Sequence, residues 1–198
     1  MRLIREVIDE FKQIQIEFEK TNNKESIRKC IDAYSGLLND APDDPEILFQ
    51  LGAAYLQLWL FGNALVYFDR CEDYWPDLPQ LHSNIGCAWR SIHQQGPARD
   101  AFIKAIMLGA GPETISNLAS SYINEDNPQE GMVWAEQAIE KDPDSPKARW
   151  NYALLCLELQ DWAKGFTYYD AGLFCGERQM RNYTDSAPDT TKWWDDAA

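Results

Sequence analysis

Histidine and cysteine, on which most metal and nucleophile chemistry depends, are scarce in this 198-residue chain. The two histidines, His82 and His93, stand in no metal-binding or nucleophile motif, and the stretch 109–112 lacks the lysine of a phosphate-binding loop. The five cysteines are widely spaced and form no CxxC pair, which favours small buried residues in a reducing compartment. We therefore expect a protein that is not an enzyme, with no catalytic residues, no metal ligands and no cofactor.

Basic clusters and long apolar runs are also missing. Lysine and arginine number 18 against 32 acidic residues, which gives a formal net charge of −14. Binding to nucleic acid or to anionic lipid needs clustered positive charge, so the composition argues against both partners. No uncharged apolar run reaches the roughly 18 residues that span a bilayer, and charged residues interrupt the N-terminal segment before a signal core forms. We expect a cytoplasmic protein with no membrane partner.

Proline, in contrast, is present in a regular arrangement. Pro45, Pro79, Pro112 and Pro146 are separated by 34, 33 and 34 residues. A proline in the first turn of a helix sacrifices no intrahelical hydrogen bond, so each of the four can begin a helix. The interval therefore predicts a structural unit of about 34 residues that is repeated along the chain.

Small and large residues recur at the same interval and indicate two antiparallel helices in each unit. Small side chains let the two helices approach closely, and large ones fill the space beside them. Turn-forming residues between the helices predict turns at Gly62–Asn63, Gly96–Pro97, Asn127–Pro128 and Gln160–Asp161. The small positions are Gly52, Gly86, Ala119 and Ala153 in the first helices and Ala64, Ala98, Gly131 and Gly165 in the second, followed by Phe68, Phe102, Ala135 and Tyr169.

This order of small, aromatic and proline positions resembles the tetratricopeptide repeat family, whose unit is about 34 residues long. The resemblance covers Pro45 to about Cys175 in four copies, with departures at Ala110, Ala135 and Cys156 that we expect to weaken individual repeats. It implies an all-α fold, a right-handed superhelix (α-solenoid) of about five helix pairs, with an extended concave groove lined by the first helix of each pair. It also implies a non-catalytic scaffold for protein-protein interaction.

Both ends of the chain differ from the four clear repeats. Residues 1–42 predict a degenerate first repeat, with helices over Leu3–Glu19 and Glu25–Leu38. The solenoid is thus expected over residues 1–176, with repeats from about 45, 79, 112 and 146, and an irregular tail over 177–198. Trp193 and Trp194 in that tail are interpreted as a cap on the solenoid, as an anchor for a partner, or as part of a linker.

A row of carboxamides is the most informative feature of the predicted groove. Gln50, Asn84, Asn117 and Asn151 each lie two residues before a small position, so they are expected to line up along the groove. A carboxamide both donates and accepts, so a ladder of them can hold the backbone of an extended peptide. The row resembles the asparagine ladder of O-linked N-acetylglucosamine transferase repeat domains. The alternative is that these side chains bond to neighbouring helices or hydrate the groove.

Other groove positions carry weaker hypotheses. Arg90 and Lys147 are the cations available for a clamp on a partner's C-terminal carboxylate, while Phe49, Trp150 and Leu154 either offer apolar pockets or pack within the fold. A rival function comes from the stretch after Asp161, which resembles repeat modules that precede glycosyltransferase domains and implies a substrate-recruiting module. Self-association through an exposed solenoid end is a third. The candidate residues for binding a protein or peptide partner are Phe49, Gln50, Asn84, Arg90, Asn117, Ser120, Trp150, Asn151 and Leu154.

Overall fold

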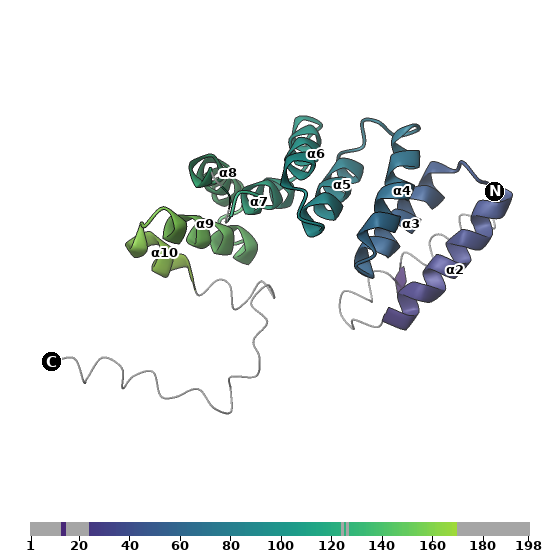
Figure 1. The fold of residues 1–198 in the computed structure, drawn as a ribbon, viewed down its shortest axis with the longest axis horizontal. Coiled ribbons are helices and arrows are strands. Elements are labelled where there is room, and N and C mark those ends of the chain that lie inside the picture. The colour runs from purple at the N-terminus through teal and green to yellow at the C-terminus, as the bar shows by residue number, and fades with distance from the viewer. Residues whose placement is uncertain (1–12, 15–23, 124, 126, 170–198) are drawn as a thin grey trace, which may run out of the picture.

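The computed structural model describes residues 13–14, 24–123, 125 and 127–169. Its described part contains helices and no strands, as predicted, and the helices follow one another in pairs along a curved array (Figure 1). Most of the predicted helix Leu3–Glu19 and the predicted tail lie outside the described residues. The helices are α2 (Lys24–Asp40), α3 (Pro45–Gln57), α4 (Phe61–Glu72), α5 (Pro79–Ser91), α6 (Gln95–Met107), α7 (Pro112–Ser120), α8 (Pro128–Lys141), α9 (Pro146–Glu158) and α10 (Trp162–Tyr169).

The four regularly spaced prolines begin four helices. Pro45, Pro79, Pro112 and Pro146 are the first residues of α3, α5, α7 and α9, where the missing N–H has no intrahelical partner to lose. Two of these starts are also capped: the Asp44 side chain accepts from the N–H groups of Glu46 and Ile47, and Ser145 accepts from that of Ala148. The predicted repeat register is therefore confirmed at the level of individual helix starts.

The small positions set how closely the two helices of a pair approach. A Cβ added to Gly52 would lie 2.4 Å from the ring of Phe68, and one added to Gly86 would lie 2.5 Å from the ring of Phe102. These rings occupy the space that a side chain on the glycine would fill. In the third of the four clear repeats, which begins at Pro112, both residues of this contact differ. Ala119 replaces the glycine, and Ala135 replaces the phenylalanine. Both alanines are buried in one cluster with Leu155.

Two of the predicted turns lie elsewhere in the structure, whereas Gln160 and Asp161 lie between α9 and α10 as predicted. Gly62 and Asn63 lie inside α4, and Gly96 and Pro97 inside α6, since the first turn of a helix tolerates residues that would break its interior. Trp59, His93 and Gln160 lie in the turns after α3, α5 and α9 and have φ values of 64°, 61° and 63°. The N–H of the next residue bonds back to the preceding helix each time, at Tyr55, Trp89 and Cys156. Helices α3, α5 and α9 are thus each followed by a residue in the left-handed conformation that is not glycine.

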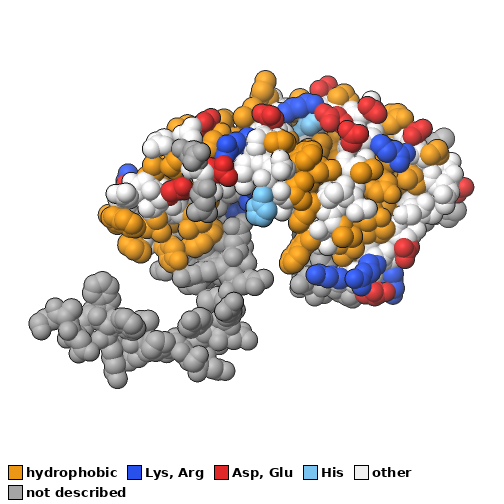
Figure 2. All heavy atoms as spheres, viewed as in Figure 1, with side chains coloured by type: hydrophobic (Ala, Val, Ile, Leu, Met, Phe, Trp, Pro, Cys, Tyr) orange, Lys and Arg blue, Asp and Glu red, His pale blue; other side chains and the backbone are white. Residues whose placement is uncertain are grey.

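The core is divided along the array into separate clusters, each shared by adjacent helices. Cys30, Cys71 and Cys156 are buried in it, and burial raises the pKa of both the Cys30 and Cys71 thiols to about 11. The array ends on an apolar surface, because Trp162 and Phe166 of α10 are exposed and hydrophobic side chains gather at that end (Figure 2). None of the described helices has the length and apolar composition needed to cross a membrane.

Candidate functional site

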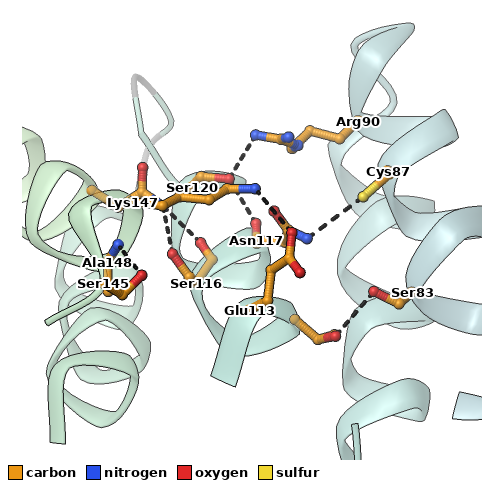
Figure 3. A network of polar contacts seen from close by, with 12 residues as sticks. Ser83, Cys87, Arg90, Glu113, Ser116, Asn117, Ser120, Ser145, Lys147 and Ala148 are labelled. Carbon is orange, nitrogen blue, oxygen red and sulfur yellow. Dashed lines mark hydrogen bonds and ion pairs between the residues drawn. The ribbon is translucent and has the colours of Figure 1, made fainter. Parts of the chain in front are cut away.

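A groove of about 510 Å³ opens between α5, α7 and the start of α9. We call it the α5–α7 groove. Residues of α5 and α7 form its walls, and Figure 3 shows side chains of α5 and of the start of α9 on either side of α7. Its lining is Pro79, Gln80, Ser83, Asn84, Cys87, Gly109, Ala110, Gly111, Pro112, Glu113, Thr114, Asn117, Asp142 and Ser145.

Polar contacts join α5 to α7 in this groove and in the hollow next to it. The hydroxyls of Ser83 and Thr114 lie 2.9 Å apart, and Arg90 Nη1 donates to Ser120 Oγ at 2.7 Å. Between these two contacts, Asn117 Nδ2 lies 3.6 Å from the Cys87 sulfur (Figure 3). Polar side chains therefore join α5 to α7, while an apolar cluster with Phe102 and Leu118 joins α6 to α7.

The predicted row of carboxamides divides into two groups. Asn84 and Asn117 line the groove, and the side chain of Asn84 makes no hydrogen bond to any described residue. Asn117 is only 3% exposed, and its Oδ1 has no donor within the described part of the chain. The Nδ2 group of Asn151, by contrast, donates to the backbone oxygen and the hydroxyl of Ser116 at 2.9 and 3.0 Å, although its Oδ1, like that of Asn117, has no donor among the described residues. Gln50 is buried in α3 away from the groove.

Charge is present at the rim and at one end of the groove. Lys147 of α9 lies 3.8 Å from Glu113 of α7, so the two oppositely charged groups face each other across the opening. Arg90 lies one turn beyond Cys87 on α5 and borders a second hollow of about 550 Å³ with Ser91, His93, Gln95, Ser120, Ile123 and Glu125. Burial raises the pKa of the Cys87 thiol, although the charges of Arg90 and Lys147 oppose the shift.

The predicted apolar positions do not line the α5–α7 groove. The ring of Phe49 packs near those of Phe68 and Trp75, with centroids 6.1 and 6.4 Å away. Trp150 packs against Tyr169 of α10 with centroids 5.0 Å apart, and Leu154 is half-buried in α9. Phe49 and Trp150 thus pack within the fold, which is one of the two alternatives considered for them. Trp193 and Trp194 lie outside the described residues.

Thr114 is a groove residue that the sequence interpretation missed. It is 5% exposed and bonds to Ser83 of α5. It lies two residues after Pro112, at the position that Ile47 and Leu81 occupy in the earlier repeats, where both are fully buried. A hydroxyl at an otherwise apolar core position was therefore the available signal, because a buried polar group requires a partner.

Among the residues that the structure describes, no cluster of three or more histidine, cysteine, aspartate or glutamate side chains with metal-binding geometry occurs. His82, the buried histidine, is bonded instead through Nε2 to the backbone oxygen of Pro76 at 2.6 Å. The chemistry that the described groove offers is therefore hydrogen bonding and charge pairing.

Comparison with known proteins gives matches in structure and none in sequence. No protein-family model matches the chain, and no curated protein matches it. Among solved structures, MamA (residues 41 to the end) from Desulfovibrio magneticus RS-1 is 17% identical with a TM-score of 0.69, covering 87% of this chain and 98% of that one. A thermophilic TPR protein from Thermus thermophilus is 18% identical with a TM-score of 0.58, covering 74% of this chain and 89% of that one.

A third similar structure is YrrB, described as a TPR protein with an unusual peptide-binding site. It is 14% identical with a TM-score of 0.63, and the match covers 86% of this chain and 87% of YrrB. At these identities the likeness concerns the fold, and it agrees with the repeat register, the paired helices and the small positions described above. The chain therefore has the fold of the tetratricopeptide repeat proteins.

Proposed function

We propose that this protein is a non-catalytic interaction module that holds an extended segment of a protein partner in the α5–α7 groove. The observation that carries the proposal is the pair of carboxamides on the groove wall, Asn84 and Asn117. Each has hydrogen-bonding capacity that the described residues leave unused. Two such groups on neighbouring helices suit a peptide backbone, which presents N–H and C=O groups in alternation.

Burial makes the Asn117 carboxamide the stronger of the two candidates. A polar atom that is shielded from water and lacks a partner costs roughly 1–3 kcal/mol, and a ligand that supplies the missing donor recovers part of that cost. Its Oδ1 is itself enclosed, so the side chain must rotate away from Cys87 to reach a ligand. The contact it gives up is a weak amide–sulfur hydrogen bond of 3.6 Å.

The proposed grip is shorter than a ladder of four. The Asn151 Nδ2 group already donates to Ser116, and Gln50 is buried outside the groove. The segment held is therefore expected to contact the second and third repeats, with the start of the fourth at the rim. YrrB, described by its peptide-binding site, is a precedent for peptide recognition on this fold.

The test begins with a positional-scanning library of unstructured decapeptides probed with the full-length chain. The strongest binder is then labelled with a fluorophore, and its affinity is measured by anisotropy. Changing Asn84 and Asn117 together to alanine should weaken binding at least about tenfold, since each lost carboxamide removes one or two hydrogen bonds. Asn63→Ala, on the exposed face of α4, removes the same group away from the groove and should leave affinity unchanged.

Modified peptides separate backbone recognition from side-chain recognition. N-methylation at one internal peptide position should weaken binding strongly, while a conservative side-chain exchange at that position should not. Full affinity in the Asn84→Ala/Asn117→Ala variant, with unchanged circular dichroism, would rule out the proposed grip. The glycosyltransferase-associated role remains a prediction, because the stretch that suggests it extends beyond Tyr169 into residues outside the described part. Self-association and a cytoplasmic location also remain predictions.

A further inference from the structure

Arg90 is the one arginine in the described part of the chain without an acidic partner. Arg28, Arg70, Arg99 and Arg149 each lie within 4.0 Å of a carboxylate, at 3.6, 3.4, 3.5 and 3.2 Å respectively. No ion pair links Arg90 to any described residue, although the chain carries 32 acidic residues and a net charge of −14. An unpaired guanidinium is therefore not a consequence of too few carboxylates.

The surroundings of Arg90 hold its guanidinium in place without satisfying it. Nη1 donates to the hydroxyl of Ser120 at 2.7 Å, and that hydroxyl in turn donates to the backbone oxygen of Asn117 at 2.7 Å. Nε is buried and has no acceptor among the described residues. A guanidinium carries five N–H donors, so most of its capacity is unused at a half-buried position.

We propose that Arg90, in the hollow next to the α5–α7 groove, is an anion-binding subsite that receives the carboxylate of an aspartate or glutamate side chain within the bound segment. This inference rests on the proposed peptide-binding function. The planar guanidinium can form two parallel hydrogen bonds to a carboxylate, and partial burial strengthens the pairing. It adds side-chain selectivity to a grip that otherwise reads only the backbone.

The position of Arg90 favours an internal side chain over the end of a peptide. Arg90 borders the hollow that His93 and Ile123 also line, and the α5–α7 groove begins one helical turn away, at Cys87. A chain that occupies both the groove and the hollow therefore passes Arg90 at an internal position. The neighbouring cation Lys147 already faces Glu113 at 3.8 Å, and the carboxylate bordering the hollow, Glu125, lies 3.5 Å from Arg99.

The experiment uses the full chain and the decapeptide selected above, prepared with glutamate, with glutamine, or with a free or amidated C-terminus. We expect the library to select an acidic residue at one internal position, and exchange of glutamate for glutamine there to weaken binding about tenfold. Arg90→Gln should remove this difference, so that both peptides bind with the lower affinity. Arg90→Lys keeps the charge and should retain part of the preference, and the preference should shrink as salt is raised.

Arg28→Gln is the matched control, because it removes the same charge from an exposed, paired arginine on α2. Equal losses in Arg28→Gln and Arg90→Gln would contradict the proposal, as would a requirement for the free C-terminal carboxylate. Loss of binding on changing Asn84 and Asn117, with unaltered glutamate preference in Arg90→Gln, would leave the proposed function standing and overturn this inference alone. Thermal unfolding of each variant checks that Arg90→Gln, which loses the Ser120 contact, remains folded.

Discussion

At the scale of single residues, identical side chains at equivalent repeat positions have different roles in this protein. Asn117 and Asn151 are 34 residues apart and occupy the same place in their helices. Asn151 bonds to Ser116 on the preceding first helix. The residue equivalent to Ser116 one repeat earlier is Ser83, but Ser83 bonds instead to Thr114. The Asn117 amide is thereby left with Cys87, a weak acceptor, while the side-chain oxygens of both Asn117 and Asn151 have no donor among the described residues.

The buried thiols give a prediction at this scale. In the unfolded chain Cys71 ionises near its ordinary pKa of 9.0, whereas burial raises its folded pKa to about 11. The folded state then holds its proton more tightly, so the free energy of unfolding should fall as pH rises from about 9 to 11. Urea unfolding in reductant measures this slope. Cys71→Ala, although less stable at every pH, should show a flatter slope, and an unchanged slope would contradict the assignment.

At the scale of the element, a helix pair is matched by two positions together, a small residue and the residue that fills its space. Gly52 with Phe68 and Gly86 with Phe102 are one solution, and Ala119 with Ala135 is another. The third of the four clear repeats therefore departs from the family pattern at both matched positions, and the expected weakening at Ala135 stays a prediction. A residue that looks degenerate alone is explained by its partner across the pair.

A double-mutant cycle tests this matching. Gly52→Ala alone places a Cβ 2.4 Å from the Phe68 ring, and the crowding should cost about 2 kcal/mol in the free energy of unfolding despite the helix propensity of alanine. In the Phe68→Leu background the same change should cost less than half as much. Gly36→Ala in α2 is the control, since its Cβ meets no atom within 4 Å, and it should be neutral or stabilising. Additive effects at Gly52 and Phe68 would count against the matching.

The turns within the pairs give a second prediction for the element. Gln160 has a φ of 63°, a conformation that costs a non-glycine residue about 1 kcal/mol. Gln160→Gly should therefore raise the free energy of unfolding by about 0.5 kcal/mol after the added flexibility of the unfolded chain is counted. Gln129→Gly, in the first turn of α8, should lower it. A destabilising effect at Gln160 would show that its side chain makes contacts that outweigh the strain.

At the scale of the whole molecule, stability is distributed along the array and not concentrated in one core. Each apolar cluster is shared by adjacent helices, so each repeat depends mainly on its neighbours. Polar contacts between α5 and α7 accompany the apolar cluster that joins α6 to α7 and α8 in the middle of the array. The α5–α7 groove lies beside these polar contacts.

Native-state hydrogen exchange tests the distributed core. Phe102 is fully buried in the cluster that joins α6 to α7 and α8. Phe102→Leu should lower the opening free energy of amides in α5–α8 by about 1–2 kcal/mol and affect those of α2 and α10 far less. A uniform decrease in all helices would instead indicate one cooperative unit. Val66→Ala, exposed on α4, is the control and should change none of them appreciably.

The repeat length, the starts of α3, α5, α7 and α9, and the all-α fold class could be predicted from the sequence alone. These follow from local chemistry, because proline fits the first helical turn and small residues recur where helices must approach. The regular spacing of the carboxamide row could also be predicted from the sequence. Which carboxamides line the groove and which bond to a neighbouring helix could not. Only the tertiary structure decided that, since the partner of each carboxamide lies on the adjacent first helix, about 30 to 35 residues away. The sequence also did not show that Arg90 lacks an acidic partner among the described residues, because an ion pair depends on which surfaces the superhelix brings together.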